Sequence, residues 1–158
     1  MEGKMMLKIK GMLYAFVGMA GGLIANLLGG WTSDMITLLI FMAIDFITGL
    51  LVAGVFKNSN KSDTGALNSK AGWKGLCKKC LTLFFVIIAH RLDIELGIDY
   101  IRTSAIIGFI ANEAMSIVEN AGLMGVPLPK VITKAIEVLK ESSDADIKGD
   151  DKNEDDEI

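Results

Sequence analysis

Two long runs of uncharged, mostly apolar residues dominate the first third of the chain. The first run covers Gly11 to Gly30, 20 residues, and the second covers Met35 to Phe56, 22 residues in which Asp45 is the only charge. A helix rises about 1.5 Å per residue, so each run is long enough to cross a hydrocarbon core of roughly 30 Å. The pattern predicts two membrane-spanning helices joined by a short turn at residues 31–34.

A third apolar segment, Cys80 to Ala89, has only ten uncharged residues and is too short to span a bilayer unaided. It can span only as part of a longer helix, from about Gly75 to Leu96. In that case two lysines extend to one interface, and charged residues near the other end pair with one another. The alternative is a helix that lies in the interface. The charged residues concerned are Lys78, Lys79, Arg91, Asp93 and Glu95.

A fourth predicted span begins near Ile101 and carries a polar stripe. Small and polar residues recur there every four positions, so they share one face of a helix, and two glutamates flank that face. Such a stripe on an apolar helix suits a side that contacts protein or water, although a short surface helix with one wet face is the alternative. The stripe consists of Gly108, Asn112, Ser116 and Asn120, flanked by Glu113 and Glu119.

Polar groups inside the apolar runs are the candidate functional residues. A carboxylate at the centre of a bilayer costs roughly 2.5–3.5 kcal/mol on insertion scales, so it usually faces a partner helix or water. We therefore predict a pore-lining or helix-interface role for Asp45, Asn112, Glu113, Ser116, Glu119 and Asn120.

Lysine and arginine counts predict the orientation. The segments outside the four spans hold 3, 0, 6, 2 and 5 basic residues in chain order. Because basic residues are enriched in cytoplasmic segments, this alternation predicts four spans with both termini in the cytoplasm. The expected fold is therefore an all-α, multi-pass membrane protein.

The first span also contains closely spaced glycines. Residues separated by four positions lie on one helix face, and small residues there allow two helices to approach closely. The alternative is a helix that is merely flexible. We predict helix packing through two adjacent ridges, which contain Gly18 and Gly22, and Gly21 and Gly29.

The chain changes character after the fourth span. Prolines stop a helix and redirect the chain, so the sequence GVPLPK predicts a turn, formed by Gly125, Pro127, Pro129 and Lys130. We expect a membrane-embedded helical domain over residues 1–125, an amphipathic helix over 126–141 and a disordered tail over 142–158. Glu141 to Ile158 holds nine acidic and two basic residues, a balance of −7, against +4 for residues 1–140.

Few residues suggest cofactor or catalytic chemistry. Cys77 and Cys80 supply half of a zinc site, and His90 lies in an apolar segment ten residues away, so we expect no metal and no cofactor. An intramembrane enzyme that uses Asp45, His90 and Glu113 lacks a nucleophile motif. Nucleic-acid binding is not expected either, because the basic loop offers only Trp73 for stacking.

The block from Ser104 to Leu139 resembles the C-terminal signature of phage lysis and toxin-secretion holins of Gram-positive bacteria and their phages. That family has a final helix with a glutamate-containing polar stripe, followed by a G-x-P-x-P-K turn into an amphipathic helix. Ile44 to Gly54 is similar to its early aspartate-containing helix. The long first span and the acidic tail depart from the family pattern. The matching residues are Asn112, Glu113, Glu119, Asn120, Gly125, Pro127, Pro129 and Lys130.

The resemblance implies a non-enzymatic holin in the bacterial cytoplasmic membrane. Such a protein associates with copies of itself in the lipid bilayer and forms lesions that release an endolysin, which lyses the host cell, or a toxin. Two alternatives from other classes stay open on the residues alone. One is a small ion channel or transporter, which also uses polar groups at mid-membrane depth. The other is a membrane scaffold that recruits partners through its acidic tail.

Overall fold

The computed structural model describes residues 2–59 and 68–138, and every regular element among them is helical. The helices are α1 (Glu2–Leu27), α2 (Ser33–Leu51), the π-helical turn η1 (Val52–Phe56) that continues α2, α3 (Ser69–Leu96), α4 (Ile101–Leu123) and a shorter helix over residues 130–138. The fold is therefore all-α, as the sequence predicted. The acidic tail and the end of the predicted amphipathic helix lie outside the described residues.

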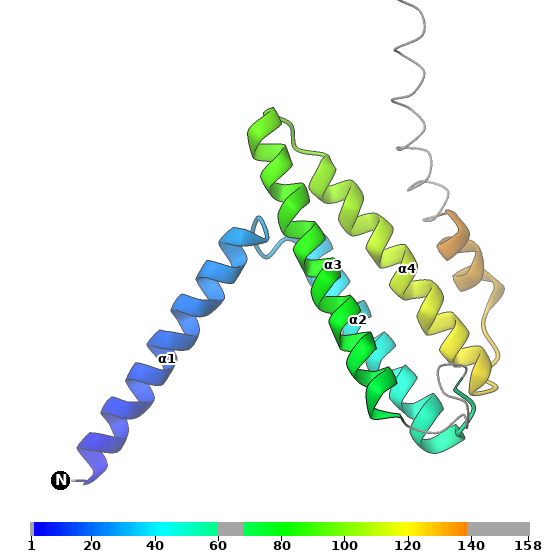
Figure 1. Cartoon of the computed structure of the whole chain (residues 1–158), viewed down its shortest axis with the longest axis horizontal. Coiled ribbons are helices and arrows are strands. Elements are labelled where there is room, and N and C mark those ends of the chain that lie inside the picture. The colour runs from blue at the N-terminus through cyan, green and yellow to red at the C-terminus, as the bar shows by residue number, and fades with distance from the viewer. Residues whose placement is uncertain (1, 60–67, 139–158) are drawn as a thin grey trace, which may run out of the picture.

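Helices α2, α3 and α4 run side by side as a bundle in which α3 is antiparallel to the other two (Figure 1), and α4 packs most extensively against α2. The apolar core lies in the half of the bundle near the α1–α2 turn. It combines the start of α2, the second half of α3 and the start of α4, and consists of Leu28, Met35, Leu38, Met42, Val86, Ile106 and Ile110. The other half of the bundle holds most of the polar side chains described below.

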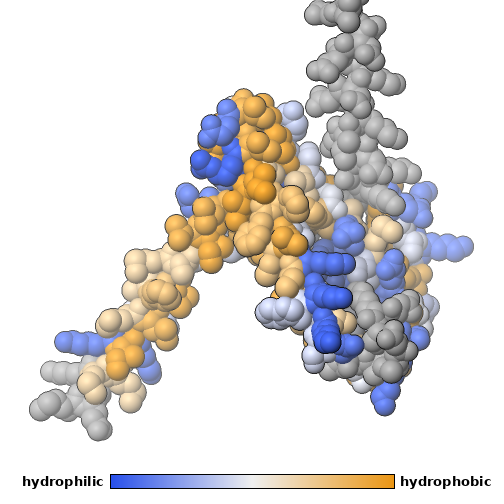
Figure 2. Space-filling view, in the orientation of Figure 1, coloured by the Kyte–Doolittle hydropathy of each residue, from blue (hydrophilic) through white to orange (hydrophobic). Residues whose placement is uncertain are grey.

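Helix α1 diverges from the bundle and exposes apolar side chains on all of its faces (Figures 1 and 2). None of its most apolar stretch is buried by the rest of the chain. An all-round apolar helix without protein neighbours is typical of a membrane span. The hydrophobic effect in water would otherwise drive it against the bundle.

Three helical segments are long and apolar enough to cross a membrane: Met5–Leu27, Ser33–Phe56 and Ile101–Leu123. They correspond to the first, second and fourth predicted spans, so the chain is a membrane protein. Helix α3 is 28 residues long, but its charged residues keep it outside that group. The fourth crossing therefore stays a prediction.

The start expected for the third helix, about Gly75, is too late, because the six residues before it are also helical. Helix α3 already begins at Ser69, where the Asn68 side chain accepts a hydrogen bond of 2.9 Å from the backbone N–H of Lys70. This contact caps an otherwise unsatisfied helix N-terminus. Lysines and glycines in the first turns of α3 concealed the helix in the hydropathy pattern.

Helix α4 ends in a turn centred on a glycine with a left-handed backbone. Gly125 has φ +75°, and its N–H donates to the carbonyl of Gly122, while the N–H of Val126 donates to that of Ala121, both at 3.0 Å. These two bonds form a Schellman motif. Residues 126–129, which include both prolines, are not helical, and the chain is helical again from residue 130.

Candidate functional site

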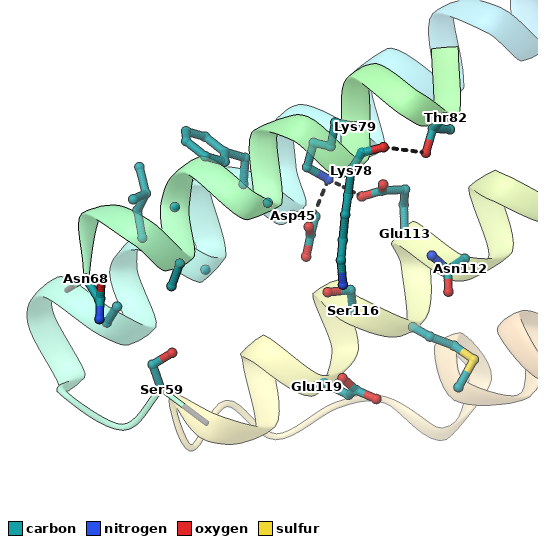
Figure 3. A pocket seen from close by; sticks show the side chains of 18 residues that line it. Asp45, Ser59, Asn68, Lys78, Lys79, Thr82, Asn112, Glu113, Ser116 and Glu119 are labelled. Carbon is teal, nitrogen blue, oxygen red and sulfur yellow. Dashed lines mark hydrogen bonds and ion pairs between the residues drawn. The ribbon is translucent and has the colours of Figure 1, made fainter. Parts of the chain in front are cut away.

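The ammonium group of Lys79 lies at the centre of the bundle between two carboxylates. It donates to Oδ2 of Asp45 at 2.9 Å and forms an ion pair with Glu113 (Figure 3). Each of the three helices contributes one charge: Asp45 from α2, Lys79 from α3 and Glu113 from α4. The three side chains are 13%, 13% and 9% exposed. The ion pairs therefore join the whole bundle at one level.

Asn120 extends this cluster along α4. Its Nδ2 donates to Oδ1 of Asp45 and to Oγ1 of Thr48, both at 3.0 Å. Asn120 follows Glu113 by two helical turns and Thr48 follows Asp45 by one, so each pair lies on one helix face. Both carboxylate oxygens of Asp45 are consequently hydrogen-bonded. We call Asp45, Thr48, Lys79, Glu113 and Asn120 the central cluster.

A cavity of about 370 Å³ adjoins the central cluster. Small residues, Gly49, Gly72 and Gly75, leave the space, and polar side chains from α3 and α4 line it. The side chain of Lys78 extends along the cavity towards Ser116 (Figure 3). The cavity reaches the bundle surface, because several of its lining residues are exposed, among them Lys78, Asn112 and Glu119.

The structure thus divides the predicted polar residues into two groups. It brings Asp45, Glu113 and Asn120 together in the central cluster, and it places Asn112, Ser116 and Glu119 along the adjoining cavity. Among the predicted packing residues, Gly18, Gly21 and Gly22 have open space beside them on α1. Gly29 lies beyond the end of α1, in the turn that leads to α2.

Lys79 and Thr48 belong to the central cluster, but the sequence did not predict them as site residues. The prediction that Lys79 extends to the interface is wrong, because two carboxylates within reach bind its ammonium group inside the bundle. The missed signal was a pair of acidic residues in apolar helices, since buried carboxylates require a cation. Arg91 and Glu95 pair on the surface of α3 at 3.8 Å, as expected, but Asp93 does not join them.

Asp93 belongs to a second polar cluster at the opposite end of the bundle. Its two carboxylate oxygens accept the backbone N–H groups of Ile101 and Arg102, at 2.9 and 3.0 Å. An acceptor from α3 thus caps the N-terminus of α4, where the helix dipole also favours a negative charge.

The Arg102 guanidinium, which is buried, ties the α1–α2 turn to α4. It donates to the carbonyl of Leu28 at 2.6 Å and to Oγ1 of Thr32 at 2.9 Å, with longer contacts to the carbonyl of Gly30 and the carboxylate of Asp34, each at 3.5 Å. The planar guanidinium suits this role because it presents five donors in one fork. We call these contacts, with Asp93, the Arg102 junction.

Gly29 allows the turn to approach Arg102 closely. Its φ is +81°, and a Cβ there would lie 2.7 Å from Nε of Arg102 and 2.8 Å from Nδ1 of His90. His90 therefore helps to form the wall of the junction. Within residues 2–59 and 68–138, no three histidine, cysteine or acidic side chains are grouped as metal ligands.

Residues 22–141 match the sequence profile of the bacteriophage holin family. The probable holin of Bacillus phage phi105 is 34% identical over 116 residues, which cover 73% of this chain and 80% of that protein. An uncharacterized protein of Halalkalibacterium halodurans is 40% identical over 123 residues, 74% of this chain and 85% of its own. A 14.9 kDa protein of Clostridium perfringens is 34% identical over 75% of this chain and 86% of its own. No solved structure matches the chain.

Proposed function

The chain belongs to the bacteriophage holin family, and we propose that it acts as a holin that assembles in the cytoplasmic membrane and forms lesions. Through these lesions an endolysin, or a toxin, leaves the cell. The observation that carries the proposal is a charged cluster and polar cavity enclosed by helices whose outer surfaces are apolar. This arrangement needs no catalytic group.

The same geometry supports a four-span topology. Helix α3 lies alongside two helices that are apolar enough to span, and it is at least as long as either of them. Two of its charges, Lys79 and Asp93, are partnered inside the bundle. Pairing removes much of the cost of placing these charges at membrane depth. With α3 as a span, the lysine distribution favours cytoplasmic positions for both termini.

The exposed part of the cavity supports self-association. Lys78, Asn112 and Glu119 lie on its open side, and polar groups facing hydrocarbon are costly. A neighbouring copy that covers them, or water that fills a lesion, removes this cost. Helix α1 supplies a second contact surface, because its small residues let another helix approach closely. Polar pairs between membrane helices contribute only about 0.6 kcal/mol each on average, so stable lesions need many copies.

The lesion is tested in lipid vesicles and in cells. We expect the purified chain to release folded, endolysin-sized proteins from vesicles, and we expect cells that also express a cytoplasmic endolysin to lyse. Replacing polar groups of the cluster and cavity, Asp45→Leu with Asn112→Leu, should leave membrane insertion intact but change the rate of release. The matched control, Ile40→Leu with Ile47→Leu, replaces exposed residues of α2 that do not line the cavity. Equal release by both double variants would exclude a pore-lining role.

A small ion channel is the second candidate, because charged side chains line the cavity. The size of the released marker separates the two functions: a channel passes ions and retains proteins. A membrane scaffold is separated by deleting residues 142–158, since a scaffold loses its function without the tail and a lesion-forming protein retains most of its own.

A further inference from the structure

The first half of α3 presents a row of positive charges. Lys70, Lys74 and Lys78 are spaced at i+4 and therefore lie on one side of the helix; we call them the α3 lysine row. All three side chains are exposed, and hydrophilic residues gather over this half of α3 in Figure 2. None of the three ammonium groups forms an ion pair with another residue that the structure describes.

The chain also carries an acidic segment that the family does not explain. The family match ends at residue 141, and Glu141 to Ile158 carries nine acidic residues against two lysines. The row and this segment have opposite charges. The segment lies outside the residues that the structure describes, and its charge is read from the sequence.

The tail can reach the row. The end of α4 and the connection that precedes α3 lie at the same end of the bundle, where Nδ2 of Asn58 donates to the carbonyl of Leu123 at 3.1 Å. An extended chain covers roughly 3.3–3.6 Å per residue, so residues 139–158 extend to about 65 Å. The 23 residues of α4 are only about 35 Å long.

We propose that the acidic tail, residues 142–158, binds the α3 lysine row of the same chain. Covalent attachment favours this partner over a free one, because a segment of the same chain has an effective local concentration that can reach the millimolar range. Anionic lipid headgroups are the natural competitors for the same lysines. The bound tail neutralises the row. The proposal depends on the proposed topology in one respect, that row and tail share one side of the membrane.

The experiment is zero-length carbodiimide cross-linking, which joins a lysine to a carboxylate only when the two groups touch. The full chain is placed in vesicles that contain phosphatidylglycerol, cross-linked and mapped by mass spectrometry, using a mixture of isotopically light and heavy chains. We expect cross-links from the tail to the α3 lysine row that join light to light and heavy to heavy. High salt should lower their yield, because exposed ion pairs are screened.

The matched variants remove two lysines each. We expect Lys70→Gln with Lys74→Gln to lower the total yield of tail cross-links about fivefold, and Lys8→Gln with Lys10→Gln, on α1, to leave it unchanged. Equal losses in both variants would show that the tail has no preference for the row. Light-to-heavy cross-links would assign it to another copy, and an absence of tail cross-links would assign the row to lipid; each of these results overturns the proposal. Cross-linking requires no lesion, so its failure leaves the holin proposal standing.

Discussion

The central cluster and the Arg102 junction both bury charges, but they satisfy them differently. At the junction, a guanidinium is held mainly by backbone carbonyls and a hydroxyl, and Asp93 by backbone N–H groups. In the central cluster, side chains from three helices hold one another, and two carboxylates share one ammonium group.

Backbone partners can leave only if a turn or helix end unwinds, whereas side-chain partners separate when helices move apart. The junction is therefore suited to fix the arrangement of α1, α2 and α4 at one end. The central cluster, with a cavity beside it, is suited to a bundle that opens. Four substitutions test this contrast, from the largest expected effect to the smallest.

Arg102→Leu should remove the contacts that hold the α1–α2 turn against α4. It leaves the Leu28 carbonyl and the Thr32 hydroxyl without their donor and the Asp34 carboxylate without its cation, and each buried polar group left unpaired costs about 1–3 kcal/mol. We expect a loss of about 4 kcal/mol in the free energy of unfolding, measured by denaturant titration in detergent micelles. The control is Arg91→Leu, because that arginine is 61% exposed and pairs at 3.8 Å. The control should lose less than about 1 kcal/mol, and equal losses would contradict the structural role.

Lys79→Met should lower the free energy of unfolding by about 3 kcal/mol, because it leaves two buried carboxylates without a cation. Lys78→Met, one position earlier on the exposed side of α3, is the control and should have little effect. Adding Asp45→Asn and Glu113→Gln removes the uncompensated charges, so we expect the triple variant to regain part of the lost stability. No recovery would show that Lys79 acts through packing instead of charge.

Gly29→Ala tests how closely the turn approaches the junction. The added Cβ meets Nε of Arg102 at 2.7 Å, and the φ of +81° is unfavourable for any residue with a Cβ, so a loss of about 2 kcal/mol is expected. Gly18→Ala on α1 serves as the comparison, since nothing lies within 4 Å of its Cβ and alanine favours a helix. Thermal unfolding followed by circular dichroism distinguishes the two. A neutral Gly29→Ala would show that the turn can relax away from Arg102.

Asn120→Ala has the smallest expected effect within the central cluster. It removes the hydrogen bonds that the neutral amide donates to Asp45 and Thr48, and it leaves the ion pairs with Lys79 in place. We therefore expect the free energy of unfolding to fall by about 1 kcal/mol, measured by the same denaturant titration. The exposed Asn112 is the control, and Asn112→Ala should change stability by a few tenths of a kcal/mol at most. A loss as large as that of Lys79→Met would mean that Asn120 is essential to the cluster.

Hydropathy and proline positions were sufficient to predict α1, α2, α4 and the turn after α4. The apolar runs predicted α1, α2 and α4, because a membrane span must be continuous in sequence. The four-residue repeat also identified Asn120 as a polar position on α4, with Glu113 flanking the repeat, because helical periodicity is a local property. The start of α3 was missed, since its first turns are basic and its cap is a single asparagine.

The local sequence therefore determines which segments are helical and which polar residues lie inside them. The local sequence does not determine which groups these polar residues bind. The Lys79 side chain can extend to the interface or turn inward, and it turns inward because α2 and α4 supply two carboxylates that bind its ammonium group. The partners of Arg102 likewise include carbonyls 72 and 74 positions away. Every residue carries the same carbonyl group, so no sequence pattern marks the few that accept from a guanidinium. Only packing of the helices brings those atoms within hydrogen-bonding distance.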